Sequence, residues 1–329
     1  MHSESVIRVQ DLSKAFDSEP VLRDLSLEVM EGEIYGLIGP SGSGKTTTIR
    51  LLLGQLTPTD GTATVLGEQP TSFATATRRR LGYMAQDFVL YPTLTIEQNV
   101  SFAAGLYGLP EWRYRDRIRE ILELVELWED RGKEAREASG GMKRRTALAA
   151  ALVHEPVLLF ADEPTANLDP ILRAKLWEYF HTLTEQGRTL LITTQYIDEA
   201  EYCTRVGLMF EGALIAEGEP ETLRREAFGG DVVEIVLEHP ATGYDRTLTN
   251  LVGVRATEVP PDRPIRVTVD SADEAIPDLV DAFEAAGAAI HSIAPYQPTF
   301  DEVFIRLIER SGRARPPSGM FQLSPVAGS

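Results

Sequence analysis

The sequence predicts an α/β protein with a parallel-sheet core, an antiparallel β subdomain, a helical subdomain and a small C-terminal α+β domain. Short, almost continuous apolar runs at 34–39, 157–162 and 189–193 support the core, because strands buried on both faces of a parallel sheet have this composition. A glycine-rich loop follows the first run and precedes a helical pattern. After the glycine pair at 229–230, strand and helix patterns resume, which predicts a second domain.

The segments of the first domain have distinct patterns. Alternating apolar residues on either side of a turn at 17–20 predict antiparallel strands between residues 6 and 33. The stretch of about 90–151 is predicted to be a helical subdomain, because apolar residues recur there at helical spacing. These residues are Ile118, Ile121, Leu122 and Val125. We assign residues 1–229 to this first domain.

The second domain is expected over residues 230–310. Strand alternation at 231–237 and 265–269, together with a helical pattern at 275–286, predicts an accessory α+β domain. The remaining residues, 311–329, combine arginine, proline and small residues without acids and are predicted to form a disordered tail. We find no internal repeat, so each chain is expected to carry one set of site motifs.

The composition limits the possible functions. Acidic residues exceed basic ones by 50 − 32 = 18, which argues against a nucleic-acid partner, because binding to phosphate backbones requires basic surface. No apolar run reaches the length of about 18 residues that a membrane span needs, so the chain is not expected to cross a bilayer by itself. The N-terminus lacks the pattern of a secretory signal, and a single cysteine, Cys203, fits a reducing cytosol.

Residues 39–46 match the phosphate-binding pattern G-x-x-x-x-G-K-[ST] between a predicted strand and a predicted helix. Glycines let successive backbone N–H groups surround an anion, and the helix N-terminus adds its dipole. Lys45 is expected to reach the β- and γ-phosphates of ATP, and the Thr46 hydroxyl to bind Mg²⁺. The nucleotide-binding residues predicted here are Gly39, Pro40, Ser41, Gly42, Ser43, Gly44, Lys45, Thr46 and Thr47.

Two carboxylates, Asp162 and Glu163, follow the apolar run at 157–161. Ligands of open α/β sheets gather at the carboxyl ends of the strands. We expect Asp162 to hold Mg²⁺ through water and Glu163 to polarise the attacking water. The structural alternative is a pair of solvated acids that end a strand, and the preceding phosphate loop favours the functional interpretation.

The sequence Ser139-Gly140-Gly141-Met142 precedes a helical stretch and resembles the signature motif of ATP-binding cassette (ABC) ATPases. A serine hydroxyl and glycine N–H groups at a helix start form a second anion cradle. The resemblance implies that this cradle closes on ATP held by a second subunit, in a head-to-tail dimer. An isolated Ser-Gly-Gly would more simply be a serine-capped helix, but its order and spacing here favour the signature.

Further motifs of the ABC family occur in order, and the resemblance covers about residues 6–228. It implies that Phe16 stacks on adenine, although a lone aromatic residue there would more often be a core residue. Gln86 resembles the Q-loop glutamine, which implies contact with Mg²⁺ and with a membrane partner. Asp169 lies in a segment similar to the D-loop, which links the two nucleotide sites of the dimer.

The sequence departs from the family pattern at several positions. Ala138 and Met142 replace the common leucine and glutamine beside the signature, and Gln195 stands where the family normally has a switch histidine. We expect the Gln195 amide to donate to the γ-phosphate and support hydrolysis without a protonation change. The alternative is a slow or regulated site. These features, with the accessory domain and the segment 300–304, resemble the daunorubicin and multidrug-resistance exporter ATPases.

The resemblance implies an ATP-hydrolysing transporter subunit, most simply of an exporter, at the cytoplasmic face of the cell membrane. Its expected partners are a second copy or a homologous ATPase subunit and an integral membrane permease. Phe88, Tyr91 and Pro92 are candidates for docking that permease or, equally, for packing of the helical subdomain. The accessory domain is expected to stabilise the dimer or the closed state rather than to sense substrate. A soluble ABC ATPase of repair or translation, or an importer ATPase, remains the alternative.

Overall fold

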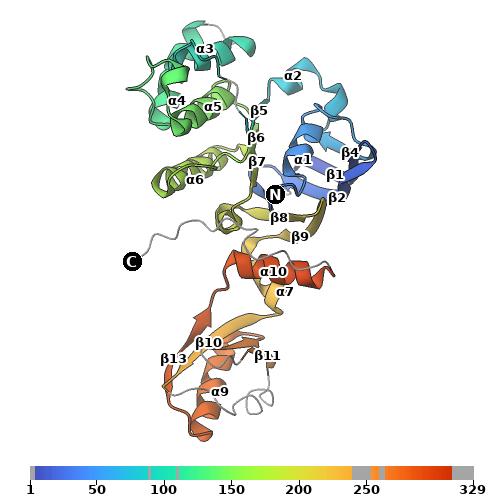
Figure 1. Cartoon of the computed structure of the whole chain (residues 1–329), viewed down its shortest axis with the longest axis vertical. Coiled ribbons are helices and arrows are strands. Elements are labelled where there is room, and N and C mark those ends of the chain that lie inside the picture. Colours follow the sequence, from blue (N-terminus) through green and yellow to red (C-terminus); the bar gives the residue numbers. More distant parts are fainter. Residues whose placement is uncertain (1–3, 88–89, 109–110, 239–252, 259–263, 313–329) are drawn as a thin grey trace. The chain divides into compact units, whose positions relative to one another are not determined.

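The computed structural model describes residues 4–87, 90–108, 111–238, 253–258 and 264–312 (Figure 1). Contacts divide the chain into two compact units that separate between Glu217 and Gly218. Helix α7 (Pro220–Phe228), which the sequence analysis placed in the first domain, packs on α10 (Phe300–Arg310) in the second unit. Gly229 has φ +80° and terminates α7, so the glycine pair marks a helix end rather than the unit boundary.

The first unit contains a six-stranded sheet in the order β5-β6-β7-β3-β8-β9. Its strands are β3 (Ile34–Ile38), β5 (Leu81–Met84), β6 (Leu158–Asp162), β7 (Thr189–Thr194), β8 (Arg205–Phe210) and β9 (Ala213–Gly218). The pairs β5–β6, β6–β7, β7–β3 and β3–β8 are parallel, and every residue of β3, β6 and β7 is buried. The parallel core predicted from the three apolar runs is therefore confirmed.

Helices connect and cover this sheet. Helix α1 (Lys45–Leu52) follows β3 and contacts β6, whereas α6 (Pro170–Glu185) contacts β7 and β3. Short helical turns are α2 (Thr75–Arg78), η1 (Pro70–Ser72), η2 (Ala135–Glu137) and η3 (Ile197–Tyr202). Because β3, β6 and β7 are parallel neighbours, the loops at their carboxyl ends lie at one edge of the sheet.

An antiparallel sheet in the order β2-β1-β4 comprises β1 (Ser5–Phe16), β2 (Glu19–Met30) and β4 (Asp60–Val65). The β1–β2 connection, Asp17-Ser18, has positive φ at both residues, as a tight two-residue hairpin requires. One apolar cluster joins this sheet to α1 and the parallel sheet. The predicted antiparallel strands around a turn at 17–20 are therefore confirmed.

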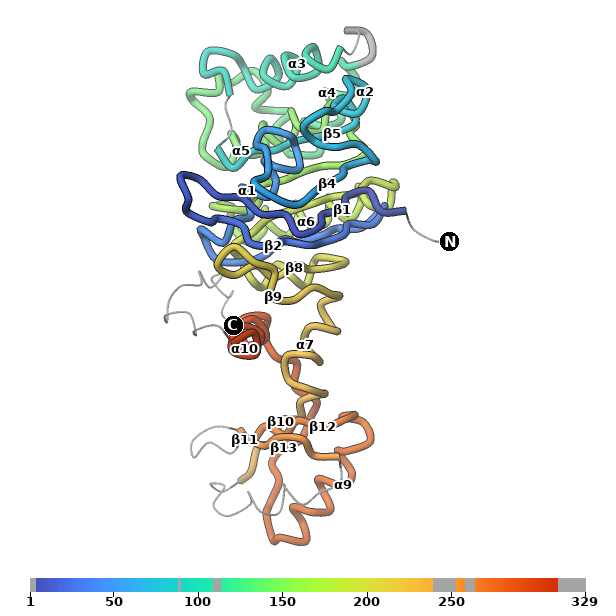
Figure 2. Tube along the Cα trace, turned by 90° about the vertical axis from the view of Figure 1, so that its right-hand side faces the viewer, coloured from blue at the N-terminus to red at the C-terminus, as the bar shows by residue number. Residues whose placement is uncertain are grey.

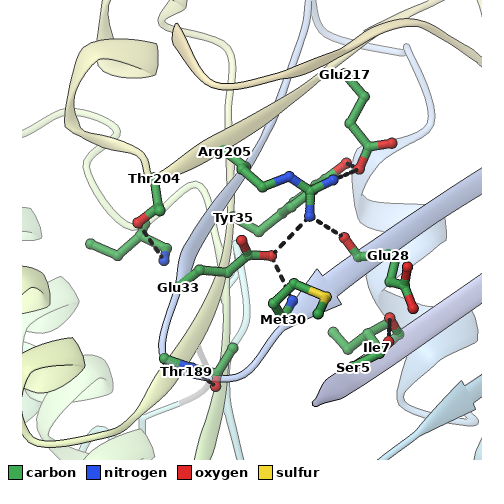
Figure 3. A network of polar contacts seen from close by, with 12 residues as sticks. Ser5, Ile7, Glu28, Met30, Glu33, Tyr35, Thr189, Thr204, Arg205 and Glu217 are labelled. Atoms are coloured by element: carbon green, nitrogen blue, oxygen red, sulfur yellow. Dashed lines mark hydrogen bonds and ion pairs between the residues drawn. The ribbon is translucent and has the colours of Figure 1, made fainter. Parts of the chain in front are cut away.

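A polar network also ties β2 to the parallel sheet (Figure 3). Arg205 Nη2 donates to Glu217 Oε1 over 2.8 Å, and its Nη1 donates to the Glu28 carbonyl over 3.0 Å and to Glu33 Oε1 over 3.4 Å. The buried Tyr35 hydroxyl donates to the same Glu217 oxygen over 2.9 Å. One guanidinium thus links strands β2, β8 and β9 and the turn before β3.

The helical segment of the first unit comprises α3 (Ile96–Leu106), α4 (Glu111–Leu124) and α5 (Gly140–Leu152). These helices contact one another, and Figure 1 shows them grouped together, apart from α1. The predicted apolar stripe at 118–125 is buried. Within the part of the chain that the structure describes, no helix has the length and apolar character needed to cross a membrane.

The second unit contains an antiparallel sheet in the order β11-β12-β10-β13. Its strands are β10 (Asp231–Leu237), β11 (Val254–Glu258), β12 (Ile265–Val269) and β13 (Ile290–Tyr296). Helix α9 (Ala272–Ala285) packs its apolar side on the sheet (Figure 2). It begins before the predicted helix at 275–286. Of the predicted tail, residues 313–329 lie outside the described residues.

Candidate nucleotide-binding site

The loop 39–44 joins β3 to α1 and leaves no room for larger residues at two of its glycines. A Cβ at Gly39 would lie 2.1 Å from the Met209 carbonyl oxygen. Gly44 has φ +102°, and a Cβ there would lie 2.4 Å from Leu22 Cδ2. The loop therefore holds its backbone close to the start of a helix, an arrangement that binds anions through N–H groups and the helix dipole.

Lys45 extends over this loop and is only 4% exposed. Its Nζ donates to the carbonyls of Gly39 and Pro40 over 2.7 and 3.0 Å. Burial lowers the pKa of Lys45, and the nearby charge of Glu163 opposes that shift. Ser43 Oγ is buried and has no hydrogen-bond partner among the described residues. The loop thus offers a cation and an unsatisfied hydroxyl, which is the chemistry that a phosphate group satisfies.

The end of β6 places a buried carboxylate beside this loop. Asp162 Oδ1 accepts hydrogen bonds from Thr46 Oγ1 over 3.2 Å and from Thr193 Oγ1 over 2.5 Å. Its second oxygen, Oδ2, is buried without a hydrogen-bond partner in the described part of the chain. A free carboxylate oxygen beside a threonine hydroxyl fits Mg²⁺, which takes one or two protein ligands and completes its shell with phosphate and water oxygens.

Glu163 has a left-handed backbone with φ +50°, a conformation that costs a residue other than glycine on the order of 1–2 kcal/mol. Thr193 fixes its amide, which donates to the Thr193 carbonyl over 3.0 Å and to Oγ1 over 3.1 Å. The carboxylate lies 4.0 Å from Lys45 Nζ and accepts from Gln86 Nε2 over 3.2 Å. Burial raises the pKa of Glu163, and the charge of Lys45 opposes this. Such strain and buried charge are concentrated at functional sites.

Three predicted residues meet at one cavity of about 390 Å³: Gln86, Glu163 and Gln195. The glycines of the predicted signature, Gly140 and Gly141, line the same cavity. Its remaining lining residues are Asp87, Arg144, Ala166, Asn167 and Leu168. The carboxylate expected to orient water therefore lies beside the signature turn of its own chain.

Ser139 caps the start of α5, where its side chain accepts a hydrogen bond from the Met142 amide over 3.2 Å. A Cβ at Gly140 would meet nothing within 4 Å, and one at Gly141 would meet only Leu168, at 3.9 Å. Space within this chain therefore does not require either glycine. Ser139 thus caps a helix within this chain, and the open approach to the glycines leaves room for a group from outside the chain.

The other predicted contacts lie apart from this cavity. Phe16 ends β1 with 43% of its surface exposed, and Lys14 Nζ lies 4.9 Å from its ring centre. Thr47 is half-buried on α1. Asp169 caps α6 through a 3.0 Å hydrogen bond from the Leu172 amide. Phe16 remains available as an aromatic platform, whereas Asp169 has a helix-capping contact of its own.

The candidate docking segment is only partly described. Phe88 lies outside the described residues. Tyr91 is 47% exposed and packs edge-to-face on Phe102 of α3 at 4.8 Å between ring centres. Pro92 accepts a backbone hydrogen bond from Arg136 over 3.0 Å. Tyr91 thus packs against the helical segment and keeps about half of its surface exposed.

The sequence analysis did not single out Thr193 or Arg144 as site residues. Thr193 follows from the parallel β6–β7 pairing, which aligns it with Asp162. The only sequence signal for Arg144 is the basic run Lys143-Arg144-Arg145 after the signature. A basic run on a helix is usually a solvated face, so the contact of Arg144 with the backbone just after β6 could not be foreseen.

A parallel sheet with a phosphate loop after β3 and paired carboxylates at the end of β6 defines a P-loop nucleotide-binding protein. Comparison with known proteins narrows this class. The family model for ABC transporters matches residues 22–166. A second model, for the C-terminal domain of DrrA1-3-like ATP-binding proteins, matches residues 218–308, which lie in the second unit.

Curated relatives agree with these matches. The daunorubicin resistance ATP-binding protein DrrA3 of Streptomyces coeruleorubidus is 37% identical over 307 residues, covering 93% of this chain and 96% of its own length. The probable multidrug ABC transporter ATP-binding protein YbhF of Escherichia coli (strain K12) is 40% identical over 235 residues, or 71% of this chain. The chain spans only 41% of that relative's length.

Solved structures share the fold of the first unit. A structure described as the ATP binding subunit of an ABC transporter has a TM-score of 0.63 at 31% identity, covering 68% of this chain and 93% of that one. The dimeric, ADP- and Pi-bound cassette MJ0796 has a TM-score of 0.60 at 27% identity, covering 65% and 98%. The chain belongs to the family of ABC transporter ATP-binding proteins, and the predicted resemblance is confirmed.

Proposed function

We propose that this chain is the ATP-hydrolysing subunit of an ABC exporter, acting at the cytoplasmic face of a membrane with an integral membrane partner. The observation that carries the hydrolytic part is the convergence of Glu163, Gln86 and Gln195 on one cavity, with the Glu163 carboxylate 4.0 Å from Lys45 Nζ. The exporter assignment rests on similarity to proteins described as multidrug, daunorubicin resistance and Nod factor export ATP-binding proteins.

The residues divide the chemistry among them. Lys45 and the loop amides hold the triphosphate, because Lys45 Nζ can exchange its contacts with the Gly39 and Pro40 carbonyls for phosphate oxygens. Thr46 and Asp162 would hold Mg²⁺, which neutralises phosphate charge when it is bound. Glu163 orients the attacking water, and its fixed amide keeps the carboxylate in place. The Gln195 amide donates to the γ-phosphate oxygens.

A second copy, or a homologous subunit, completes each site in this proposal. Gly140 and Gly141 are open toward the outside of the chain. They are the first residues of α5, so they lie at the positive end of the helix, which Ser139 caps. A phosphate bound to the partner's loop would occupy this space. The MJ0796 cassette, which shares the fold, is described as a dimer bound to ADP and Pi, which supports this arrangement.

The hydrolytic assignment is tested by ATP turnover of the full chain, alone and in membranes that carry its partner. Glu163→Gln removes the carboxylate charge without changing the shape and is expected to lower turnover about 100-fold or more, while ATP binding persists. Equal turnover by wild type and Glu163→Gln would refute the assignment of Glu163. Nucleotide-dependent dimerisation of Glu163→Gln, measured by light scattering, tests the two-copy site.

The transport assignment is tested by the partners that copurify with the full chain. A protein with several membrane spans is expected in gently solubilised membranes. Ribosomes or DNA in its place would favour the soluble repair or translation alternative. In sealed vesicles whose ATPase subunits face outward and receive external ATP, an exporter moves substrate into the lumen, so movement out of the lumen would favour the importer alternative.

A further inference from the structure

One side chain connects the signature helix to the backbone of the proposed catalytic acid. Arg144 lies in the second turn of α5 and is 7% exposed. Its Nε donates to the Pro164 carbonyl over 2.8 Å, and its Nη2 donates to the Glu163 carbonyl. Arginine suits this task because its planar fork can bind two neighbouring acceptors at once.

These bonds fix the carbonyl of Glu163, whereas the contacts with β7 fix its amide. Thr193 of β7 fixes the Glu163 amide through two contacts, of 3.0 and 3.1 Å. Arg144 fixes the carbonyl of the same residue and that of Pro164. Because Glu163 is left-handed, with φ +50°, small changes at either peptide would redirect its side chain. The Gln86 contact at 3.2 Å depends on that direction.

The same helix begins at the signature turn. Gly141 lies three residues before Arg144, which is less than one turn of an α-helix. Both residues line the cavity that contains Glu163. A short rigid element therefore separates the place where a second copy's nucleotide is proposed to bind from the carbonyl of this chain's own Glu163.

We infer that Arg144 is a positioning residue that couples occupancy of the signature turn to the placement of Glu163. This inference rests on the proposed function, in which a second copy's nucleotide binds at Ser139, Gly140 and Gly141. Movement of α5 when that nucleotide binds is transmitted through the two hydrogen bonds to the backbone of Glu163. Hydrolysis at one site of the dimer thereby depends on the nucleotide at the other.

The neighbouring Arg145 provides a matched control. Its Nη1 donates to the carbonyls of Val125 and Glu126 over 2.9 and 3.1 Å. It therefore has the same charge, the same helix and a similar pair of backbone acceptors, but these acceptors lie within the helical segment. Both Arg144→Gln and Arg145→Gln remove an arginine from α5. Only Arg144→Gln removes the contact with Glu163.

The first experiment separates kcat from ATP affinity in the full chain. Arg144→Gln is expected to lower kcat by about 10- to 100-fold, because small misplacements of a catalytic group have effects of this size. The dissociation constant of a fluorescent ATP analogue is expected to change less than about threefold, because Arg144 does not touch the phosphate loop. Arg144→Lys, which retains a charged donor, should fall between wild type and Arg144→Gln. Arg145→Gln should stay within about threefold of wild-type kcat.

The second experiment tests the coupling by a double-mutant cycle with Gly141→Ala. A Cβ at Gly141 meets only Leu168, at 3.9 Å, so this variant can fold while blocking approach to the signature turn. If Arg144 transmits occupancy, Gly141→Ala lowers kcat strongly in wild type and much less in Arg144→Gln. If the fold-decrease in kcat of the double variant equals the product of those of the two single variants, the coupling is refuted.

The outcomes also distinguish this inference from the proposed function. If Glu163→Gln abolishes turnover but Arg144→Gln and Arg145→Gln have equal kcat, the inference is overturned and the proposed function stands. Turnover unaffected by Glu163→Gln would overturn the proposed function itself. An equal loss of kcat and ATP affinity in both Arg144 variants would show a general structural role and would also overturn the inference.

Discussion

His154 provides a test of how the signature helix is attached to the sheet. It follows α5, and its Nε2 lies 2.9 Å from the Leu81 carbonyl at the start of β5. A carbonyl only accepts, so Nε2 carries the proton and Nδ1 is bare. Nδ1 is buried without a hydrogen-bond partner in the described chain, and the ring stacks on Tyr107 at 3.4 Å between centres. Protonation would therefore place an unsolvated N–H here.

The consequence is a folded state that resists protonation of His154. Burial lowers its pKa from the ordinary value of 6.5 to about 4, and the charge of Arg188 adds to this shift. The unfolded chain then binds the proton more readily, so this contribution to stability is complete above pH 6.5 and is lost as the pH falls toward 4. At pH 4.5 the loss is on the order of 2–3 kcal/mol, from the difference between these two pKa values.

The assay is urea unfolding of wild type and His154→Gln at pH 8 and pH 4.5. Gln retains an N–H donor for Leu81 but does not titrate. The three tryptophans lie in the first unit, so their fluorescence reports on the relevant part of the chain. The difference in unfolding free energy between wild type and His154→Gln should fall by about 2–3 kcal/mol between pH 8 and pH 4.5. His181→Gln, at an exposed position on α6, is the control. A pH-independent difference for His154→Gln would refute the argument.

Three further predictions concern the site and its support. Lys45→Ala is expected to reduce ATP turnover about 100-fold or more and to weaken nucleotide binding, and normal turnover would contradict its role. Gln195 does not titrate, so it should add no pH dependence to wild-type turnover near pH 6.5. Gln195→His should add one, because imidazole titrates in that range. Tyr35→Phe should cost about 1 kcal/mol in urea unfolding, because Arg205 still satisfies the Glu217 oxygen; a loss several times larger would contradict this.

The sequence alone predicts those parts of the fold that depend on local chemistry. The runs that became β3, β6 and β7 could be recognised because their residues are apolar on both faces. The loop at 39–46 could be recognised because a phosphate cradle needs glycines at fixed spacing. The order β5-β6-β7-β3-β8-β9 could not be predicted, because strand pairing joins residues far apart in the chain without a local signal.

Long-range contacts also explain what the sequence analysis missed in the domain boundary and at the site. The glycine pair at 229–230 suggested a domain boundary, yet the packing of α7 on α10 is visible only in three dimensions. Glu163 was recognised as a carboxylate at a strand end, but its left-handed φ follows from contacts with Thr193 and Arg144. A local pattern thus predicts which residue types are present, whereas their precise placement depends on distant partners.

Helix α5 shows how such partners combine. Ser139 caps its start, Arg144 holds the carbonyl after β6, and His154 beyond its end binds the carbonyl of Leu81 at the start of β5. Gln86 follows β5, which α5 contacts, and Glu163 follows β6 and has its carbonyl bound by Arg144 of α5. A group bound at the signature turn therefore acts on a helix that is attached to β5 and to the backbone just after β6. This attachment gives α5 a physical means of changing the geometry between Gln86 and Glu163, which lie 3.2 Å apart.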